Sequence, residues 1–382
     1  MLLVMNKLNV AVIGLGTIGG GVSRMLIKNN YPFITLYAIC DKDKNRLNEF
    51  SDDIKKYQDY KEVLNDKNVE VIVEVMGGER IAFALIKEAL EKNINVVSAN
   101  KEVVAKHYLE LSDILRKSNA RFMFEASVGG VVPIINAIYN YKRANRIDHI
   151  EGIINGSTNF LLTLMQKDGV SFNNAIADAK EKGFLEQDPS SDLKGLDMKR
   201  KIVILSNIAY NTALDLDKVY NYSLEGVSDE FIKEVNNNGY ILKYMAESNL
   251  KEDHVEIRIE PVLVKNDSIY ASVLYERNYI AFCGAEQEKI ELLGLGAGRY
   301  PTSTAIVSDI IQITNLDEKL DLVVDNELKI DNSALTDKYL IDGEINKDLI
   351  GRKVGKFFET KMIERKEIED NLDKIKFYAR IK

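Results

Sequence analysis

Histidine is scarce in this chain, which contains only three among its 382 residues. They are His107, His149 and His254, and no two of them stand at the spacing of metal ligands. A histidine-based zinc site is therefore not expected, and neither is a histidine general base. If the protein transfers protons, lysine is the better candidate, provided that its neighbours tune it.

Cysteine and long apolar runs are also rare. The two cysteines, Cys40 and Cys283, are far apart and lie in apolar surroundings, which predicts two buried free thiols rather than a disulfide. No apolar run is long enough to span a bilayer, and the N-terminal stretch MLLVMNKLN lacks the basic leader of a secretory signal. We therefore expect a cytoplasmic protein.

Positive charge is in deficit, because 51 Lys and Arg stand against 59 Asp and Glu, a net charge of −8. This balance argues against nucleic acid or an anionic membrane as a partner. The hydrophobic fraction of 46% and the charged fraction of 29% are ordinary for a globular protein. The length indicates two or three domains with an ample core.

A glycine-rich turn follows the first apolar stretch. A strand expected at residues 8–13 runs into GLGTIG and then into a helical pattern, and a second strand at residues 33–40 ends beside Asp41. In this pattern the first glycine permits the tight turn, the second admits a pyrophosphate, and the third lets helix and strand pack closely. Free N–H groups and the helix dipole favour an anion there. The pattern predicts a dinucleotide site that includes Gly14, Gly16, Thr17, Ile18 and Gly19.

The residues after the second strand bear on the choice of dinucleotide. Asp41 would accept hydrogen bonds from a ribose hydroxyl and repel a 2′-phosphate, which favours NAD. Lys42, Lys44 and Arg46 would neutralise such a phosphate, which favours NADP, but they also suit a solvated start of the next helix. The balance favours NAD slightly, or the use of both cofactors.

Strands continue to alternate with helices, with strands expected at residues 69–75, 94–98 and 122–125. This alternation predicts an α/β fold with a doubly wound parallel sheet of the Rossmann type, whose ligands gather at the carboxyl ends of the strands. Lys101 is expected on the nicotinamide side, because a cation at a helix N-terminus is electrostatically unfavourable and needs a reason. The other cofactor residues expected at these ends are Gly77, Ser98 and Asn100.

The segment GFLEQDPSSDLKGLDMKRK, residues 183–201, gathers carboxylates and a lysine. If a helix starts near Asp192, then Asp197 and Lys201 lie four residues apart on one face. Carboxylates that hold an amino group and a lysine that exchanges a proton would suit a small zwitterion. The same spacing fits an ordinary surface ion pair, and spacing alone does not separate the two interpretations.

Several segments together resemble homoserine dehydrogenases. They are VEVMGG (73–78), SANK (98–101), EASVGG (125–130), NGSTNFLLTLM (155–165), the 183–201 segment, RIEPVLV (258–264) and GLGAGRYPTSTAIVSDI (294–310). The resemblance covers residues 8–315 in order. It implies interconversion of aspartate β-semialdehyde and homoserine with NADH or NADPH, on the path to threonine and methionine.

The resemblance also implies roles for individual residues. Lys201 and Lys101 match lysines proposed for substrate binding and proton transfer, and Asp192 matches a carboxylate near the reacting oxygen. The implied substrate-binding residues are Glu186, Asp197, Asn155 and Thr158. Gly296 belongs to a turn that lines the nicotinamide and substrate crevice.

A monovalent-cation site and a subunit interface are implied as well. Na+ or K+ would bind largely to backbone carbonyls at Glu125, Val128, Gly130 and Val132, with Glu125 supplying charge. Val131 stands where the family commonly has a third glycine. The family's second domain makes the subunit interface, which implies a homodimer or a dimer of dimers.

Three parts are expected along the chain. A dinucleotide-binding domain over residues 1–145 is completed by a returning helix near 302–315, and a second α+β domain with a mixed sheet over 146–300 binds substrate and makes the dimer. In that domain we expect strands at 150–154, 255–264 and 268–274, and helices at 159–166, 172–182 and 193–211. Residues 317–382 form an extension, with strands at 338–345 and 374–381 around a helix at 347–358. It fits a packing extension or a partial or divergent regulatory unit.

Two other functions compete with this one. The first is another amino-acid dehydrogenase of similar architecture, such as one acting on aspartate, and the 183–201 segment argues against it. The second is a dinucleotide-binding regulatory protein that has lost catalysis. The presence of both lysines and all three carboxylates disfavours that alternative.

Overall fold

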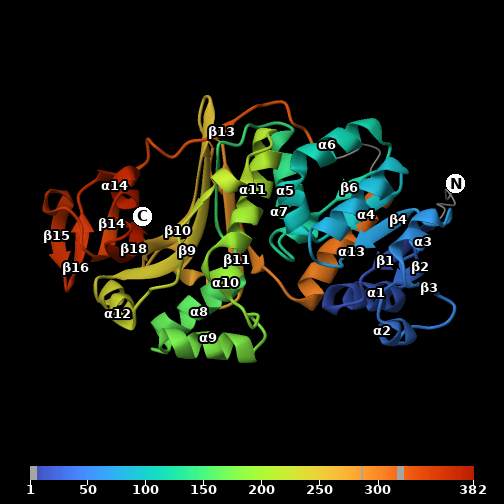
Figure 1. Cartoon of the computed structure of the whole chain (residues 1–382), viewed down its shortest axis with the longest axis horizontal. Coiled ribbons are helices and arrows are strands. Elements are labelled where there is room, and N and C mark those ends of the chain that lie inside the picture. The colour runs from blue at the N-terminus through green and yellow to red at the C-terminus, as the bar shows by residue number, and fades with distance from the viewer. Residues whose placement is uncertain (1–6, 285–286, 316–321) are drawn as a thin grey trace. The chain divides into compact units, whose positions relative to one another are not determined.

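The computed structural model describes residues 7–284, 287–315 and 322–382, and the chain divides into two compact units (Figure 1). Unit 1 comprises residues 1–140, 211–213 and 297–326, and unit 2 comprises residues 141–210, 214–296 and 327–382. Each unit is therefore assembled from three separate pieces of the sequence.

Unit 1 is built on a six-stranded parallel sheet with the strand order β3-β2-β1-β4-β5-β6. The strands are β1 (Leu8–Ile13), β2 (Ile34–Cys40), β3 (Lys55–Tyr57), β4 (Val71–Glu74), β5 (Asn95–Ser98) and β6 (Phe122–Met123). This order is that of the Rossmann fold, so the prediction of a doubly wound parallel sheet is confirmed.

Helices of unit 1 connect and cover these strands. They are α1 (Thr17–Asn29), α2 (Lys44–Asn48), α3 (Tyr60–Asn65), α4 (Arg80–Glu91), α5 (Lys101–Lys106), α6 (Tyr108–Lys117), α7 (Ile134–Lys142), whose end enters unit 2, and α13 (Arg299–Asn315). A short 3-10 helix spans Glu125–Ser127.

The late helix α13 belongs to the same core as the first strands. Its residues Ile306, Val307 and Ile310 are buried in one apolar cluster with Val10 of β1 and Val22 of α1. In Figure 1, α13 (orange) lies beside α1 (blue), although the sequence separates them widely. The helix that the sequence predicts to return to the nucleotide-binding part is therefore present.

The strand predicted at 122–125 is shorter than expected. It ends at Met123, and Glu125 already lies in the 3-10 helix. The backbone N–H of Glu125 donates to Oδ2 of Asp309, 2.9 Å away, so its partner is a side chain of α13 rather than a neighbouring strand.

Unit 2 contains a twelve-stranded mixed sheet, whose main path runs β12-β11-β7-β9-β10-β18-β14-β16-β15. The strands on this path are β7 (His149–Ile153), β9 (Tyr240–Leu250), β10 (His254–Lys265), β11 (Arg277–Cys283), β12 (Ile290–Leu295), β14 (Thr336–Gly343), β15 (Ile350–Val354), β16 (Phe357–Thr360) and β18 (Ile375–Ile381). Off the path lie β8 (Tyr220–Asn221), β13 (Lys329–Ile330) and β17 (Ile363–Glu364). The predicted mixed sheet is confirmed.

The helices of unit 2 are α8 (Gly156–Lys167), α9 (Phe172–Glu181), α10 (Ser190–Leu193), α11 (Leu196–Tyr210), α12 (Asp229–Asn237) and α14 (Arg365–Glu369). Short 3-10 helices span Leu216–Lys218, Ile269–Ser272 and Lys347–Leu349. The single helix predicted at 193–211 is divided, because Gly195 adopts a left-handed φ of 76° between α10 and α11.

Two predictions of secondary structure in unit 2 are wrong. Residues 268–274 form a 3-10 helix and a loop instead of a strand, because the carbonyl of Val273 accepts hydrogen bonds from the side chains of Asn159 and Lys243. Residues 347–358 form the hairpin of β15 and β16 instead of a helix. Gly355 adopts a φ of 59° in the two-residue turn between paired Val354 and Phe357, a conformation that favours glycine.

The C-terminal strands join the sheet of unit 2 directly. Strand β18 pairs with β10 and with β14, and the red strands in Figure 1 therefore continue the yellow ones. Buried ion pairs cross this junction: Glu260 contacts Arg365 at 3.0 Å and Arg380 at 2.8 Å, and Glu247 contacts Arg258 at 2.8 Å and Arg380 at 2.7 Å. The extension shares one buried charged network with the middle of the chain.

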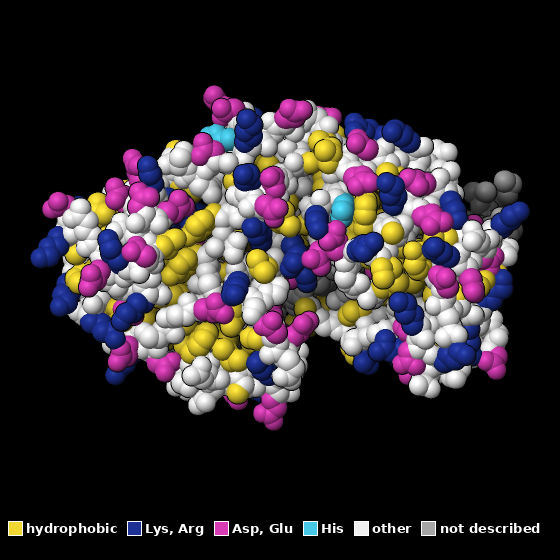
Figure 2. Space-filling view, viewed as in Figure 1, with side chains coloured by type: hydrophobic (Ala, Val, Ile, Leu, Met, Phe, Trp, Pro, Cys, Tyr) yellow, Lys and Arg dark blue, Asp and Glu magenta, His cyan; other side chains and the backbone are white. Residues whose placement is uncertain are grey.

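Acidic and basic side chains are interspersed over the face drawn in Figure 2. None of the helices in the described part of the chain has the length and apolar character that a membrane crossing requires. Cys40 and Cys283 are both free thiols, but Cys283 is only partly buried, since it ends strand β11 close to the sheet edge.

Candidate functional site

Two glycines of the glycine-rich turn of unit 1, Gly14 and Gly19, have no room for a side chain. A Cβ on Gly14, whose φ is 95°, would lie 2.7 Å from the carbonyl oxygen of Val75. A Cβ on Gly19 would lie 1.8 Å from the carbonyl oxygen of Gly14. Gly16 is the N-cap of α1 and offers no side-chain acceptor to the N–H groups of Thr17, Ile18 and Gly19 in the first turn. An anion would meet these N–H groups and the positive end of the helix dipole.

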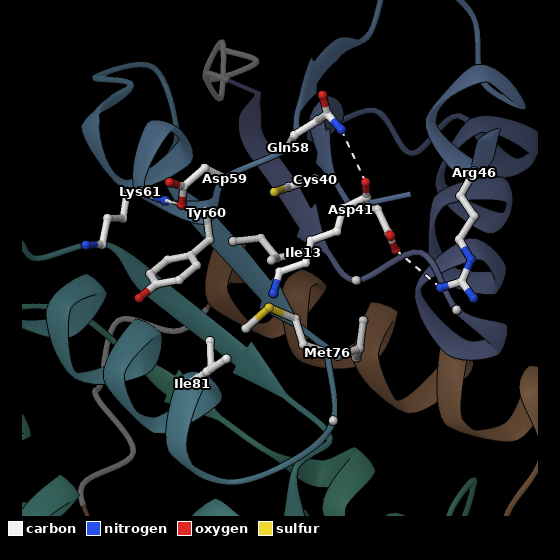
Figure 3. Close-up of a pocket in the computed structure, with 15 residues that line it drawn as sticks. Ile13, Cys40, Asp41, Arg46, Gln58, Asp59, Tyr60, Lys61, Met76 and Ile81 are labelled. Carbon is white, nitrogen blue, oxygen red and sulfur yellow. Dashed lines mark hydrogen bonds and ion pairs between the residues drawn. The ribbon is translucent and has the colours of Figure 1, made fainter. Parts of the chain in front are cut away.

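A cavity of about 670 Å³ lies beside this turn (Figure 3). The turn contributes Gly14 and Gly16, the carboxyl end of β2 contributes Asp41, and the loop after β4 contributes Gly77. The remaining lining comes from Ile13, Cys40, Lys42, Arg46, Gln58, Asp59, Tyr60, Lys61, Val75, Met76 and Ile81. Its position at the carboxyl ends of β1, β2 and β4 is where Rossmann sheets bind nucleotides.

Asp41 is held in place by the turn itself. Its Oδ2 accepts a hydrogen bond from the N–H of Leu15 at 2.6 Å, and its Oδ1 accepts one from Asp43 at 2.9 Å. Arg46 reaches Oδ2 at 3.5 Å, as the dashed line in Figure 3 shows. Burial alone would raise the pKa of Asp41, but these hydrogen bonds and the charge of Arg46 lower it. Asp41 is therefore an anion that faces the cavity.

Glu74 organises the strand ends next to this cavity, and the sequence did not single it out. It is fully buried; its Oε1 accepts from the N–H of Met76 at 2.9 Å and its Oε2 from Ser98 Oγ at 2.7 Å. Ser98 Oγ accepts from the N–H of Asn100 at 3.0 Å, and Asn100 Nδ2 donates to the carbonyl of Gly78 at 2.6 Å. The loops after β4 and β5 are thus tied together. The only sequence signal was an acid at the end of the apolar strand VIVE.

Lys101 begins helix α5, as the sequence predicts. The side chain of Asn100 caps this helix by accepting from the N–H of Val103 at 3.2 Å, and Lys101 is half-buried. The same network that starts at Glu74 therefore fixes the backbone that carries Lys101.

The residues of the expected cation site form a turn between β6 and α7. Gly129 and Gly130 adopt left-handed φ values of 81° and 60°, and Val131 is not among the residues with positive φ. The Glu125 carboxylate points to the N-terminus of α7, where it accepts from the N–H groups of Ile135 and Asn136 at 2.9 and 2.8 Å. Burial raises the pKa of Glu125 to about 7, against the effect of these hydrogen bonds.

A second cluster, in unit 2, is centred on Asn155, the N-cap of α8. Its Nδ2 donates to Asp192 Oδ1 at 2.6 Å and to Asp197 Oδ2 at 3.0 Å. Its Oδ1 accepts from the N–H of Thr158 at 2.8 Å and from Thr158 Oγ1 at 2.9 Å. Lys201 Nζ contacts Asp197 Oδ2 at 2.7 Å and donates to the carbonyl of Ile154 at 2.8 Å. We call Asn155, Thr158, Asp192, Asp197 and Lys201 the Asn155 cluster.

The Asp197–Lys201 pair is buried, since the two residues are only 5% and 7% exposed. An ordinary surface ion pair, which the spacing alone allowed, is therefore excluded. Withdrawing two charges from water is costly, and such pairs persist where their geometry and hydrogen bonds are favourable. Here the amide of Asn155 and the carbonyl of Ile154 supply those hydrogen bonds.

Glu186 is not brought into this cluster. It is exposed in the segment between α9 and α10 and makes no hydrogen bond or ion pair with the residues that the structure describes. Gly296 follows β12 beside the buried Asn278, whose Nδ2 would lie 2.0 Å from a Cβ at this position. A side chain at this position would require Asn278 to shift.

The three histidines have side-chain partners outside these two groups of residues, and His254 contacts the neighbouring Asp253. His107 stacks on Phe83 with ring centroids 3.7 Å apart and contacts Glu79, while His149 contacts Asn249. Within residues 7–284, 287–315 and 322–382, no group of three or more His, Cys, Asp or Glu side chains could hold a metal ion.

Comparison with known proteins assigns both parts of the chain to one enzyme family. A family model described as homoserine dehydrogenase matches residues 133–311, and one described as its NAD binding domain matches residues 14–125. The homoserine dehydrogenase of Neisseria gonorrhoeae is 32% identical over 321 residues, which cover 82% of this chain and 74% of that protein. That of Methanocaldococcus jannaschii is 32% identical and covers 82% of this chain and 100% of that protein.

Solved structures show the same fold. A homoserine dehydrogenase from Thiobacillus denitrificans superposes with a TM-score of 0.89 at 24% identity, over 99% of both chains. The Staphylococcus aureus enzyme gives a TM-score of 0.79 at 25% identity, again over 99% of each chain. The structural likeness includes the C-terminal segment. The family assignment rests on the sequence relatives. This chain belongs to the homoserine dehydrogenase family, the NAD(P)-dependent oxidoreductases that interconvert L-aspartate 4-semialdehyde and L-homoserine.

Proposed function

We propose that the Asn155 cluster binds the amino-acid substrate and that Lys201 moves the proton. The observation that carries this proposal is the continuous chain of contacts from Asp192 through Asn155 and Asp197 to Lys201. Within it, the Asp192 carboxylate is half-buried and can meet a ligand, whereas Asp197 is buried against the lysine. We assign the reacting oxygen of the substrate to the Lys201 ammonium group, with the Asp192 carboxylate near it, and we assign Glu186 and Asp197 to substrate binding.

The two directions of the reaction require opposite protonation states of Lys201. During reduction of the aldehyde, the ammonium form stabilises the growing negative charge on oxygen and donates a proton to it. During oxidation of homoserine, the neutral amine accepts the hydroxyl proton. When bound, the nicotinamide would supply or accept the hydride. Asp197 and the carbonyl of Ile154 keep the Lys201 nitrogen in one position in both directions.

The residues of unit 1 are assigned to the cofactor. The pyrophosphate would lie on the N–H groups of Gly16, Thr17, Ile18 and Gly19, with Asp41 facing the adenosine ribose. Gly14, Gly77, Ser98 and Asn100 shape the loops around the dinucleotide, and Gly296 of unit 2 is assigned to it too. Lys101, at the start of α5, is assigned to the nicotinamide side and to proton transfer. These roles rest on the cavity, on the bare helix N-terminus and on the Glu74 network.

For the choice of cofactor we favour NAD slightly, or use of both. Asp41 is an anion on the cavity wall, which disfavours a 2′-phosphate, but Lys42, Arg46 and Lys61 line the same cavity. A related archaeal homoserine dehydrogenase, with a TM-score of 0.69, was solved in complex with NADPH.

Replacing Asp41 with alanine should raise the efficiency with NADP relative to NAD by roughly tenfold, the effect of one charged contact. The replacement removes the carboxylate that repels a phosphate and releases Arg46, which contacts it at 3.5 Å. The ratio of kcat/KM values for the two cofactors measures this effect. Asp52→Ala, at an exposed carboxylate of the same unit, is the control for charge. An unchanged ratio in the Asp41 variant would remove Asp41 from cofactor selection.

The assay for the proposed function is the appearance of reduced cofactor during homoserine oxidation at mildly alkaline pH, with NAD and NADP in parallel. We expect turnover with homoserine and none with aspartate or lactate. Cofactor binding without any turnover would instead favour a non-catalytic regulatory protein, and turnover with aspartate a different amino-acid dehydrogenase.

We also propose a monovalent cation, Na+ or K+, on the carbonyl oxygens of Glu125, Val128, Gly130 and Val132. The carbonyls of Glu125 and Val132 each accept one backbone hydrogen bond and keep a second lone pair. The Glu125 carboxylate supports the site through the N-terminus of α7, with which it is hydrogen-bonded.

A homodimer is the proposed assembly, with strand β12 at its interface. This strand ends the sheet path of unit 2, and its residues Ile290, Leu293 and Leu295 are 37%, 50% and 40% exposed. An edge strand with such side chains is a template for pairing with a second copy.

Leu293→Glu should therefore shift the protein from dimer to monomer, because it places a charge in an apolar interface. Light scattering coupled to size exclusion measures the mass directly. Leu109→Glu, at a residue of α6 that is 51% exposed, should leave the mass unchanged. A Leu293 variant that stays dimeric would place the interface elsewhere.

A further inference from the structure

Lys243 is a buried lysine that the reaction described above does not use. It lies on strand β9 and is 1% exposed. Its ammonium nitrogen donates to Asn159 Oδ1 at 3.1 Å and to the carbonyl of Val273 at 2.5 Å. Burial lowers the pKa of Lys243 to about 8, and the charge of Lys167 adds to this effect. Burying a lysine with an amide and a carbonyl as partners is costly for the fold, so its place there calls for a role.

The first partner of Lys243, Asn159, lies in the first half of α8 and is itself 1% exposed. While its Oδ1 accepts from Lys243, its Nδ2 lies 3.1 Å from the carbonyl of Val273, 2.8 Å from that of Tyr275 and 3.2 Å from that of Arg277. Lys243 and Asn159 therefore both donate hydrogen bonds to the backbone of residues 273–277. We call residues 273–277 the strap.

The strap is a strained segment that lies directly on α8. Tyr275 adopts a left-handed φ of 56°, which is unfavourable for a tyrosine, and its N–H donates to Thr163 Oγ1 of α8 at 3.0 Å. A Cβ on Gly156 would lie 2.6 Å from the carbonyl oxygen of Glu276. The backbone of the strap at Glu276 therefore packs directly against Gly156, the first residue of α8.

The first turn of α8 carries the substrate groups. Its N-cap is Asn155, whose amide holds Asp192 and Asp197, and Gly156 follows at once. Ser157 Oγ donates to the carbonyl of Phe184 at 2.5 Å, which ties the same turn to the segment that carries Glu186. Any displacement of the strap would move this turn, and with it the Asn155 amide.

We propose that Lys243 is a positioning residue for the reaction, which fixes the Asn155 amide by clamping the strap onto the first turn of α8. The inference rests on the proposed role of the Asn155 cluster as the substrate site. Lys243 does not touch that cluster itself; it acts through Asn159 and Val273. A misplacement of about 1 Å at a reacting group can cost on the order of a hundredfold in rate.

The test is Lys243→Met, which keeps the length of the side chain and removes its hydrogen-bond donors. We expect kcat/KM for homoserine to fall by about 10- to 100-fold, while the dissociation constant for NADH, measured by its fluorescence, stays within about twofold. Lys265→Met, at an exposed lysine that ends strand β10, should change neither quantity and serves as the matched control.

A double-mutant cycle tests whether Lys243 acts through Asn159. If Lys243 acts through Asn159, the Lys243→Met and Asn159→Leu changes should be non-additive, so that the double variant is no slower than the worse single one. Additive losses, or an unchanged kcat/KM in a folded Lys243→Met protein, would overturn the inference. If Lys243→Met does not fold, Lys243→Gln, which retains a donor, takes its place in the cycle with the same expected non-additivity.

The outcomes also separate this inference from the proposed function. Lys201→Ala with full activity would refute the Asn155 cluster as the substrate site, whatever the Lys243 variant shows. Loss of activity in Lys201→Ala, together with normal kinetics in a folded Lys243→Met, would refute only the positioning role.

Discussion

Replacing Lys201 with alanine is expected to lower kcat for homoserine oxidation by about 10²- to 10⁴-fold, the usual contribution of a positioned proton donor or acceptor. The dissociation constant for the dinucleotide should change by less than about twofold, because Lys201 lies in unit 2 while the glycine-rich turn and its cavity lie in unit 1. Steady-state kinetics and titration of NADH fluorescence measure the two quantities on the same preparation. A loss of kcat at unchanged cofactor affinity is the signature of a group that acts in the transition state.

Lys199→Ala is the matched control for this experiment. Lys199 is a half-buried lysine on the same helix α11, and the Asn155 cluster does not include it. We expect the control to keep most of its activity. A Lys201 variant that retained activity within tenfold of the wild type would contradict the assignment of the proton to Lys201.

The second large effect is expected on stability. Glu260→Ala should lower the free energy of unfolding by about 3–5 kcal/mol, the usual cost of removing one partner from a buried ion pair. Glu260 is fully buried, and its loss leaves Arg365 and Arg380 without the carboxylate that they contact at 3.0 and 2.8 Å. Because these arginines lie on α14 and β18, the C-terminal segment should be the part most affected.

Urea denaturation followed by circular dichroism measures this loss. The control is Glu369→Ala, which removes a 41% exposed carboxylate from the same Arg365 and should cost less than about 1 kcal/mol. Equal losses in the two variants would show that the buried network does not hold the segment.

The same network sets the response of stability to acid. Burial would raise the pKa of Glu247 and Glu260, but the charges of the surrounding arginines outweigh it and lower both values. A carboxylate whose folded pKa is depressed stabilises the fold fully above its unfolded pKa of about 4.3, and this stabilisation is lost as the pH falls through the folded value. In Glu260→Ala the acid-dependent loss of stability should be smaller than in the wild type.

The sequence predicted the parts of the fold that depend on local patterns. The GLGTIG turn, the strands of the parallel sheet and the Asp197–Lys201 spacing each follow from neighbouring residues and from elementary geometry. The predicted strand at 268–274 failed because long-range partners, Asn159 and Lys243, take its backbone hydrogen bonds. The helix predicted at 347–358 is absent because Gly355, with a φ of 59°, forms a tight turn that lets β15 and β16 pair.

The candidate site was less accessible from the sequence than the fold. Asp197 and Lys201 share a helix, so their contact was predictable. Asn155, however, lies 37 residues before Asp192 and 42 residues before Asp197, so its contacts with them could not be predicted from local patterns. The strand patterns around Glu74 and Lys243 gave no reason to single either residue out, because their partners lie on other elements. The sequence also did not show that Glu186 is exposed while Asp197 and Lys201 are buried.

The central claim is that homoserine binds at the Asn155 cluster with its reacting oxygen on Lys201. The most direct measurement is a crystal structure of the protein with L-homoserine and NADH bound. The account predicts the homoserine hydroxyl within hydrogen-bond distance of Lys201 Nζ and its ammonium group beside a carboxylate of the 183–201 segment. Homoserine bound elsewhere, with Lys201 still engaged only by Asp197 and Ile154, would contradict it.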